Sequence, residues 1–337
     1  MERAILRRNV VSRKDASIES LRGIAIVLVV AYHAISGPTF SVGAGAPYQF
    51  LSSIFDYVRM PLFTVISGYV YSLRPVRTAL GEFYRGKARR LLVPLVTVST
   101  LEYLARASLP GVTLVEPLAG IWRIYVYGFM HYWFIQAIFV CYLVIGWLDY
   151  RRYLENYRHW QIVFVLAIAV SIFVPRPLLF SLGAALYLMP FVVLGYGINR
   201  FATQLSHPAV LLGCGSLFAV TIVLQQLVNH GVVSLDNYSA RALVAAVGAS
   251  ANVLFFRIRQ PWRPLALLGG FAYFIYLTHA FSVGIGTRLA SRLIDVAAHP
   301  GSHLLICLIV GLGLPIIAQL WLQRYHWFRL LFQGLRT

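Results

Sequence analysis

Two ionisable side chains stand eleven residues apart at the ends of the first long apolar stretch, Arg22 and His33. In a helix this spacing is three turns plus about 20°, so both would lie on one face, separated by a rise of about 16 Å. Histidine is the usual general base near neutral pH, and an ionisable group inside an apolar span is a functional hypothesis by default. The structural alternative is that Arg22 snorkels to lipid headgroups and His33 packs between helices.

The next apolar stretch carries Asp56 and Arg59, three residues apart, with Ser67 further along the face of Arg59. This spacing allows an ion pair within a helix, and it places Arg59 roughly 16 Å deep. An arginine at such a depth could hold an anion or stabilise a developing oxyanion. A neutral, purely structural Asp56–Arg59 pair is the alternative.

More polar residues are expected in the same outer half of the apolar segments, namely Glu102, His131 and His279. An aromatic belt at the membrane surface explains Tyr132 and Trp133 but not His131. Together with His33, Asp56 and Arg59, these residues predict a polar cavity displaced toward the outer face. Three histidines and carboxylates could bind a metal, but they lie in different segments without ligand-type spacing, so we predict no metal site.

The rest of the chain must supply helices that position these residues in a membrane. Of its 337 residues 59% are hydrophobic and only 12% are charged, and the mean hydropathy is +0.72. A soluble globular chain carries about 25% charged residues, so the composition excludes a soluble fold, disorder and a coiled coil. Because a helix needs about 20 apolar residues to cross a bilayer, we predict an all-α polytopic membrane protein of about ten transmembrane helices, at 18–37, 48–72, 90–107, 128–148, 161–175, 178–198, 208–228, 241–256, 265–287 and 304–323.

The charges support this topology. The chain has 29 Lys and Arg against 11 Asp and Glu, a net charge of +18. With both termini placed in the cytoplasm, the cytoplasmic segments hold all basic residues except Arg59, Arg106, Arg123, Arg176, Arg241, Arg288 and Arg292. This is the positive-inside pattern of membrane proteins, so we do not expect nucleic-acid binding.

A single membrane domain is expected over 1–337, with a basic cytoplasmic N-terminus (1–17) and a cytoplasmic tail (324–337). The first apolar stretch is interpreted as a transmembrane helix rather than a cleaved signal peptide, because its basic region is long and Arg22 and His33 flank its core. The cysteines lie singly inside apolar runs, where they are expected to pack as small apolar residues; they are Cys141, Cys214 and Cys307.

The residues alone predict a membrane site with histidine, carboxylate and arginine. The nucleophile elbow, the Walker A loop and the dinucleotide fingerprint are all missing from the sequence. An enzyme and a transporter therefore both stay open at this point.

Five motifs in order resemble the acyltransferase 3 family of integral membrane acyltransferases. They are Ser20-Leu21-Arg22-Gly23-Ile24-Ala25 with Tyr32-His33; Arg59-x-x-x-Phe63-Thr64-x-x-Ser67-Gly68-Tyr69; Arg89-Arg90-Leu91-Leu92-Val93-Pro94; His131-Tyr132-Trp133-Phe134; and Tyr273-x-x-Tyr276-Leu277-x-His279. Thr64 departs from the family, which usually has a second Phe there.

The resemblance implies transfer of an acyl group, usually acetyl, from a coenzyme A thioester to a hydroxyl of a surface polysaccharide, a glycolipid or a small metabolite. It implies that His33 is the catalytic histidine and that Arg22 and Arg59 are essential. We expect Asp56 and Glu102 to assist catalysis. We expect the acceptor to contact Ser67, His131, Trp133, Tyr276 and His279.

The donor is cytosolic and anionic, and arginines suit phosphates, so we expect it to bind the basic residues Arg22, Arg85, Lys87, Arg89 and Arg90. The alternative for this cluster is that it only follows the positive-inside rule. Direct transfer is preferred to an acyl-histidine intermediate. We expect the protein in the inner, cytoplasmic membrane, and a transporter or flippase of an anionic or lipid-linked sugar is the alternative function.

Overall fold

The chain is described by a computed structural model over residues 15–36, 45–108 and 118–335. In these ranges it forms helices and connecting turns, with no strand. The α-helices are α2 (Ala16–Ile35), α3 (Ala46–Ser53), α4 (Arg59–Ser72), α5 (Leu80–Ser108), α6 (Arg123–Val126), α7 (Trp133–Tyr150), α8 (Tyr157–Phe173), α9 (Leu182–Arg200), α10 (Ala202–Leu205), α11 (Pro208–Asn229), α12 (Asn237–Ile258), α13 (Arg263–Leu293), α14 (Pro300–Leu322) and α15 (His326–Gln333), with 3₁₀ turns η1 (Leu118–Gly120), η2 (Met130–Tyr132) and η3 (Leu179–Ser181).

The protein is an all-α polytopic membrane protein. A helix lies at each of the ten apolar segments of the sequence. Seven helical stretches of the described residues are long and apolar enough to cross a membrane: Ala16–Ile35, Leu118–Tyr150, Leu179–Arg200, Pro208–Asn229, Asn237–Ile258, Arg263–Leu293 and Pro300–Leu322. The number of ten crossings, and the cytoplasmic side of each end, stay predictions.

Local sequence sets where these helices begin. Asp15 caps α2 by accepting a hydrogen bond from the backbone N–H of Ser17 at 2.9 Å, and Asp236 caps α12 in the same way through Tyr238. Prolines occupy the first turns of α11, α13 and α14, where a missing N–H costs nothing. Between α8 and α9, the extended segment around residues 174–177 interrupts the apolar run.

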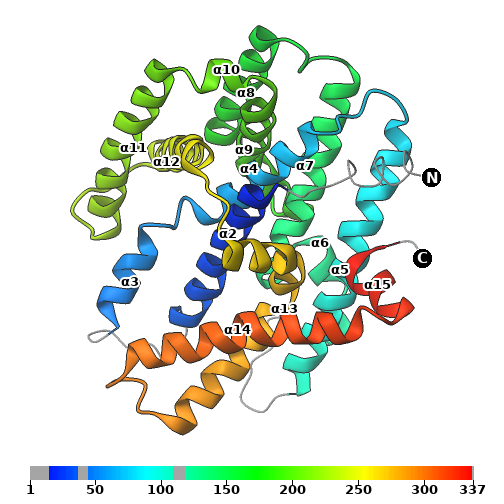
Figure 1. The fold of residues 1–337 in the computed structure, drawn as a ribbon, viewed down its shortest axis with the longest axis vertical. Coiled ribbons are helices and arrows are strands. Elements are labelled where there is room, and N and C mark those ends of the chain that lie inside the picture. The colour runs from blue at the N-terminus through cyan, green and yellow to red at the C-terminus, as the bar shows by residue number, and fades with distance from the viewer. Residues whose placement is uncertain (1–14, 37–44, 109–117, 336–337) are drawn as a thin grey trace, which may run out of the picture.

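Helix α2 lies at the centre of the bundle, between α13 and α4 (Figure 1). Helix α13 also packs on α14, and α4 packs on α9, which is flanked by α7 and α8. Helices α11 and α14 lie at the periphery, and their apolar side chains are largely exposed, as for Leu212 and Ile317. An exposed apolar face on a polytopic membrane protein is a face toward lipid.

Glycines allow the two central helix pairs to approach closely. A Cβ added at Gly23 would collide with the carbonyl of Leu265 on α13, and one at Gly269 with the carbonyl of Glu19 on α2. The α4–α9 pair is built alike, with Gly68 against Val192. Small residues at helix contacts are how membrane helices gain packing without a hydrophobic driving force. The two contacts fix helices that carry six of the predicted site residues, namely Arg22 and His33 on α2, Arg59 and Ser67 on α4, and Tyr276 and His279 on α13.

The predicted helix 48–72 is wrong in detail, because two helices, α3 and α4, occupy it. Between them the carbonyl of Phe55 accepts from the N–H groups of both Val58 and Arg59 at 3.0 Å. Pro61 has no N–H with which to bond the carbonyl of Tyr57, so a continuous helix would lose a hydrogen bond there. Helix α4 begins at Arg59 instead, which places Pro61 in the first turn, where an N–H has no partner within the helix.

Two other expectations change at the ends of helices. Helix α5 begins ten residues before the predicted segment 90–107, so Arg85, Lys87 and Arg89 lie on its first turns. The predicted tail 324–337 contains α15, which packs on α5, with Phe328 fully buried. The basic N-terminal residues 1–14 lie outside the described residues, so the predicted N-terminus (1–17) is described from Asp15 onward only.

Candidate active site

Three histidine side chains from distant parts of the sequence meet in one place. The ring centroid of His33 lies 4.7 Å from that of His279 and 6.2 Å from that of His131, and the His131 and His279 centroids are 4.3 Å apart. His33 is in the last turn of α2, His131 in η2 and His279 in α13. The glycine-mediated packing of α2 on α13 therefore brings two of the three together.

Hydrogen bonds hold the ring of His279 and the backbone of His131. Nδ1 of His279 lies 2.7 Å from the carbonyl oxygen of Tyr276. Because a carbonyl only accepts, this Nδ1 carries the proton in the neutral ring and Nε2 is left as an acceptor. The hydroxyl of Tyr276 donates in turn to the carbonyl of His131, which ties η2 to α13.

Two ring nitrogens in this cluster have unused hydrogen-bonding capacity. Nε2 of His131 and Nε2 of His279 are buried, and neither has a hydrogen-bond partner among the described residues. Buried polar atoms without partners are rare in folded proteins. Because these two nitrogens belong to neighbouring rings, a substrate hydroxyl or a water molecule placed between them could supply the missing hydrogen bonds.

A cavity of about 850 Å³ opens beside the histidines. This is within the usual range of small-ligand pockets, roughly 300–1,000 Å³. Of the predicted site residues, those that line it are His33, Arg59, Glu102, His131, Trp133 and Tyr276. Asp56, Ser67 and His279 do not line it. The ring of His279 lies behind the cavity wall, next to the rings of His33 and His131.

Arg59 is held firmly at the cavity wall. Its Nη2 donates to Oδ1 of Asp56 at 2.8 Å and its Nη1 to Oγ of Ser52 at 3.3 Å. The guanidinium also stacks over the ring of Tyr32, 3.9 Å from its centroid. The side chain is largely buried, so the planar group has one orientation. Asp56 lies in the turn before α4 and acts as an orienting carboxylate rather than as a group that reaches the cavity.

Glu102 is less available than the sequence indicates. Its Oε1 accepts from Nε of Arg106 at 2.9 Å, and its Oε2 accepts from the hydroxyl of Tyr132 at 2.7 Å. The interpretation of Tyr132 as a belt residue is wrong, because this ring is fully buried and its hydroxyl binds a carboxylate on α5. Trp133 lines the cavity instead.

Comparisons with known proteins show the family of the chain. A family model described as an acyltransferase domain matches residues 15–331. The chain belongs to the acyltransferase 3 family. Nodulation protein NolL of Mesorhizobium japonicum is 28% identical over 191 residues, which are 55% of this chain and 48% of that protein, so the match spans about half of the relative's length. No solved structure matches.

The cavity holds groups suited to acyl transfer, the chemistry after which the family is described. A histidine exposed to the cavity can remove a proton from a hydroxyl. A fixed guanidinium can stabilise negative charge that develops on a carbonyl oxygen. Among the described residues, no group of three or more His, Cys, Asp or Glu side chains is arranged to hold a metal ion.

The basic residues predicted to bind the donor are nearer the opposite ends of the helices, and three of them have partners. Nη1 of Arg22 donates to Oε1 of Glu19 at 2.7 Å, and Nζ of Lys87 lies 3.4 Å from the ring centroid of Tyr142. Nε of Arg89 donates to the carbonyl of Gly334, beyond α15. Arg85 and Arg90 are exposed at the surface of α5.

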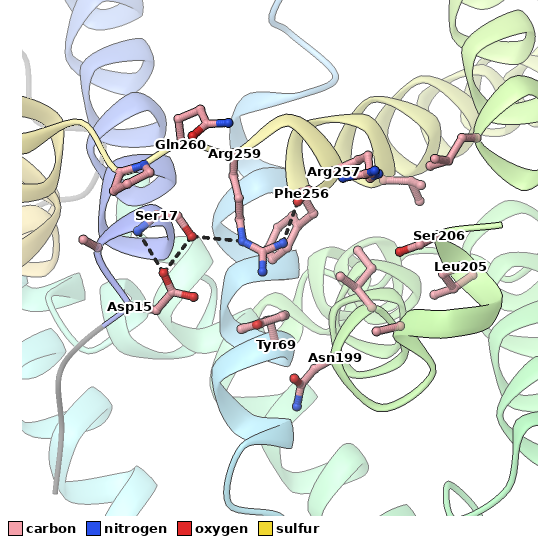
Figure 2. A pocket seen from close by; sticks show the side chains of 16 residues that line it. Asp15, Ser17, Tyr69, Asn199, Leu205, Ser206, Phe256, Arg257, Arg259 and Gln260 are labelled. Carbon is pink, nitrogen blue, oxygen red and sulfur yellow. Dashed lines mark hydrogen bonds between the residues drawn. The ribbon is translucent and has the colours of Figure 1, made fainter. Parts of the chain in front are cut away.

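A second cavity, of about 580 Å³, lies at the end of α2 and α4 opposite the histidines. Figure 2 shows the guanidinium of Arg259 at its centre, with Tyr69 and Asn199 across from it. Nε of Arg259 donates to Oγ of Ser17 at 3.0 Å, and Nη1 donates to the carbonyl of Phe256. Nη2 is left without a hydrogen bond to the described residues.

Two further charges belong to the wall of this second cavity, Arg257 and Asp15. Burial acts to raise the pKa of the Asp15 carboxyl, but hydrogen bonds from Ser17 and the charge of Arg259 hold this pKa below its ordinary value. Asp15 is therefore ionised at neutral pH, and the wall carries one excess positive charge. In the sequence, Arg257 and Arg259 are explained only by the positive-inside pattern.

Two arginines that were not predicted as site residues also line the histidine cavity, Arg106 and Arg288. A signal was present, because both are among the seven basic residues on the predicted outer side, and Arg106 stands four residues after Glu102. The ring of Tyr32 supports Arg59, a role that its place in the Tyr32-His33 motif does not predict.

Proposed function

We propose that the protein is a membrane acyltransferase that moves an acyl group, most simply acetyl, from a cytosolic acyl-CoA to a hydroxyl of a sugar in a surface polysaccharide or glycolipid, in the cytoplasmic membrane. The observation that carries this proposal is the cluster of His33, His131 and His279 beside a cavity whose wall also holds Arg59. A base and a fixed cation around one cavity are what transfer of an acyl group to a hydroxyl requires.

In the proposed reaction the acceptor hydroxyl enters the cavity and donates its hydrogen bond to the ring of His33. His33 removes the proton as the hydroxyl oxygen attacks the thioester carbonyl carbon. The C–O bond forms, the carbonyl oxygen becomes an oxyanion beside Arg59, and the C–S bond then breaks. The leaving sulfur takes the proton from the imidazolium, so His33 returns to its neutral state with an ester and free coenzyme A as products.

The second cavity supports a cytosolic approach of the donor. It lies at the predicted cytoplasmic ends of α2 and α4, whose other ends carry His33 and Arg59. Arginines bind phosphate oxygens through their planar donors. We therefore assign the donor's phosphates to Arg257 and Arg259 in preference to the basic cluster on α5, and the acceptor to the histidine cavity.

The experiment that tests this function measures both products. Full-length protein in liposomes receives acetyl-CoA labelled in the acetyl group, with and without a soluble acceptor sugar. An acyltransferase of this kind releases free coenzyme A and labels the sugar, and both depend on the acceptor. A transporter or flippase would move the sugar across the bilayer and leave acetyl-CoA intact, which would reject the proposal.

A further inference from the structure

The wall of the histidine cavity carries four charged side chains, Arg59, Glu102, Arg106 and Arg288. Arg59 is paired with Asp56 and Arg106 with Glu102, each at 2.8 Å. Arg288 has no hydrogen bond or ion pair with any described residue. Two of the three arginines are thus neutralised, and Arg288 leaves the wall with one uncompensated positive charge.

Arg288 is placed to act on whatever the histidines hold. On α13 it stands two turns after Ala280, and Gly284 lies between them on the same face, with all three lining the cavity. Helical side chains lean toward the N-terminus of their helix, and Nη1 of Arg288 lies only 4.0 Å from the position that a Cβ of Gly284 would take. The guanidinium therefore lies back over Gly284, toward the histidines.

The axial separation between Gly284 and Ala280, the neighbour of His279, is about 6 Å. The dimension of one sugar ring is of that order. A group bound by the guanidinium and a hydroxyl bound by a histidine therefore belong to the same sugar or to adjacent sugars. The wall between them is mainly apolar, with Phe281 and Val283 on α13, and a charged hydrogen bond is stronger where water is displaced.

We infer that the acceptor is an anionic sugar, bearing a carboxylate or a phosphate that Arg288 binds while its hydroxyl lies at the histidine cluster. This inference rests on the proposed function, because it names the class of acceptor that the transfer uses. Arg288 becomes a residue that determines specificity. The competing role for an exposed arginine near a membrane surface is contact with the phosphates of lipid headgroups.

The test compares three soluble acceptors of one sugar: methyl glucoside, methyl glucuronide and glucose 6-phosphate. Acetyl transfer by the full chain in nanodiscs is measured for each. A charge-assisted hydrogen bond contributes a factor of about 10 to 100, so we expect kcat/KM to be higher by that factor for at least one of the two anionic sugars than for the neutral glucoside. The preferred one identifies whether the group is a carboxylate or a phosphate.

The variant Arg288→Gln should abolish the preference: its kcat/KM for the preferred anionic sugar should fall by about 10- to 100-fold, to the value that the same variant shows for the glucoside. Arg292→Gln is the matched control, because Arg292 is exposed one turn further along α13 and does not line the cavity. Arg288→Lys should retain part of the preference.

Two results would overturn the inference. One is wild-type protein that acetylates all three sugars equally, and the other is Arg288→Gln protein that keeps its preference, as expected if Arg288 contacts only lipid. Calorimetric binding of the same sugars, compared between wild type and Arg288→Gln, decides the inference without turnover. If anionic sugars bind through Arg288 but no acceptor releases coenzyme A, the proposed function fails while the anionic site stands.

Discussion

The three histidines differ in what surrounds each ring. His279 is fully buried and fixed by a backbone carbonyl, and His131 is buried apart from the cavity wall. His33 is only partly buried, at the last turn of α2, and makes no hydrogen bond with the described residues. A base must have a free nitrogen within reach of the hydroxyl, so His33 is the side chain best placed to remove its proton.

We expect His33→Ala to fold and to bind the donor normally but to lower acyl transfer by about 10²- to 10⁴-fold, the usual contribution of a positioned base. Single-turnover transfer to an acceptor sugar measures this. His299→Ala is the control, because His299 is an exposed histidine at the start of α14 whose side chain makes no capping bond. Full transfer by folded His33→Ala protein would falsify the assignment and direct the search to His131.

Arg59 binds Asp56 and Ser52 through two different nitrogens while stacking on Tyr32. Lysine keeps the positive charge but loses the planar fork. We therefore expect Arg59→Lys to insert into the membrane normally and to lose most activity, about 10- to 100-fold if one charge-assisted hydrogen bond is lost. Measured turnover close to wild type would mean that any cation at this depth suffices.

At this scale the sequence predicts several residues of the site, but not Arg106 and Arg288, and it does not predict how each is engaged. His33, His131 and His279 stand out because ionisable groups are rare in apolar stretches. The engagement of both Glu102 oxygens by Arg106 and Tyr132 depends on contact between α5 and η2, which spacing along the chain does not encode. That Arg288 has no partner among the described residues is equally a property of the folded chain.

Among the helices, α4 and α9 can pack closely only because glycines, which have no side chain, lie at their contact. A Cβ at Gly195 would collide with the carbonyl of Val65 on α4. Gly195→Ala should therefore destabilise the protein by about 1–3 kcal/mol, the usual cost of overpacking. Thermal unfolding in detergent would show a lower midpoint.

Gly213→Ala is the matched control for this prediction. Gly213 lies on α11 with no atom within 4 Å of its would-be Cβ, and alanine is the better helix former by roughly 1 kcal/mol. We expect the control to hold or raise the unfolding midpoint. Equal unfolding midpoints for both variants would show that the α4–α9 contact accommodates the extra methyl group without a loss of stability.

The positions of the helices were predictable from apolar length, and their breaks were not. Residues 48–72 are apolar enough throughout to be read as one span, yet the chain turns at 54–58 because Pro61 cannot bond to Tyr57. Helix α5 extends past its apolar part into a charged stretch that hydropathy excludes. Helix α15 is short, and its burial against α5 depends on tertiary contact.

For the molecule as a whole, the basic residues predict which ends of the helices face the cytoplasm. Cysteines placed at Asn237 and at Arg85, both exposed, test this orientation in a variant without Cys141, Cys214 and Cys307. A membrane-impermeant thiol reagent added outside should label the first position and not the second. Labelling at Arg85 instead would mean that the orientation in the membrane is opposite to the predicted one, with the histidine cavity toward the cytoplasm.

Under the proposed function the second cavity is the donor end and the histidine cavity is the acceptor end, and this arrangement predicts where the phosphates of coenzyme A bind. Arg257 lines the second cavity beside Arg259, whereas Arg85 is exposed on α5. We expect Arg257→Gln to raise KM for acetyl-CoA by about 10-fold or more, the value of one charge-assisted hydrogen bond, and Arg85→Gln to leave it unchanged. Acetyl-pantetheine, which has the same thioester arm without phosphates, should be used equally by all three proteins. The opposite ranking of the two variants would return the donor to the basic cluster of α5, and an equal loss with both thioesters would show that Arg257 supports the fold rather than the phosphates.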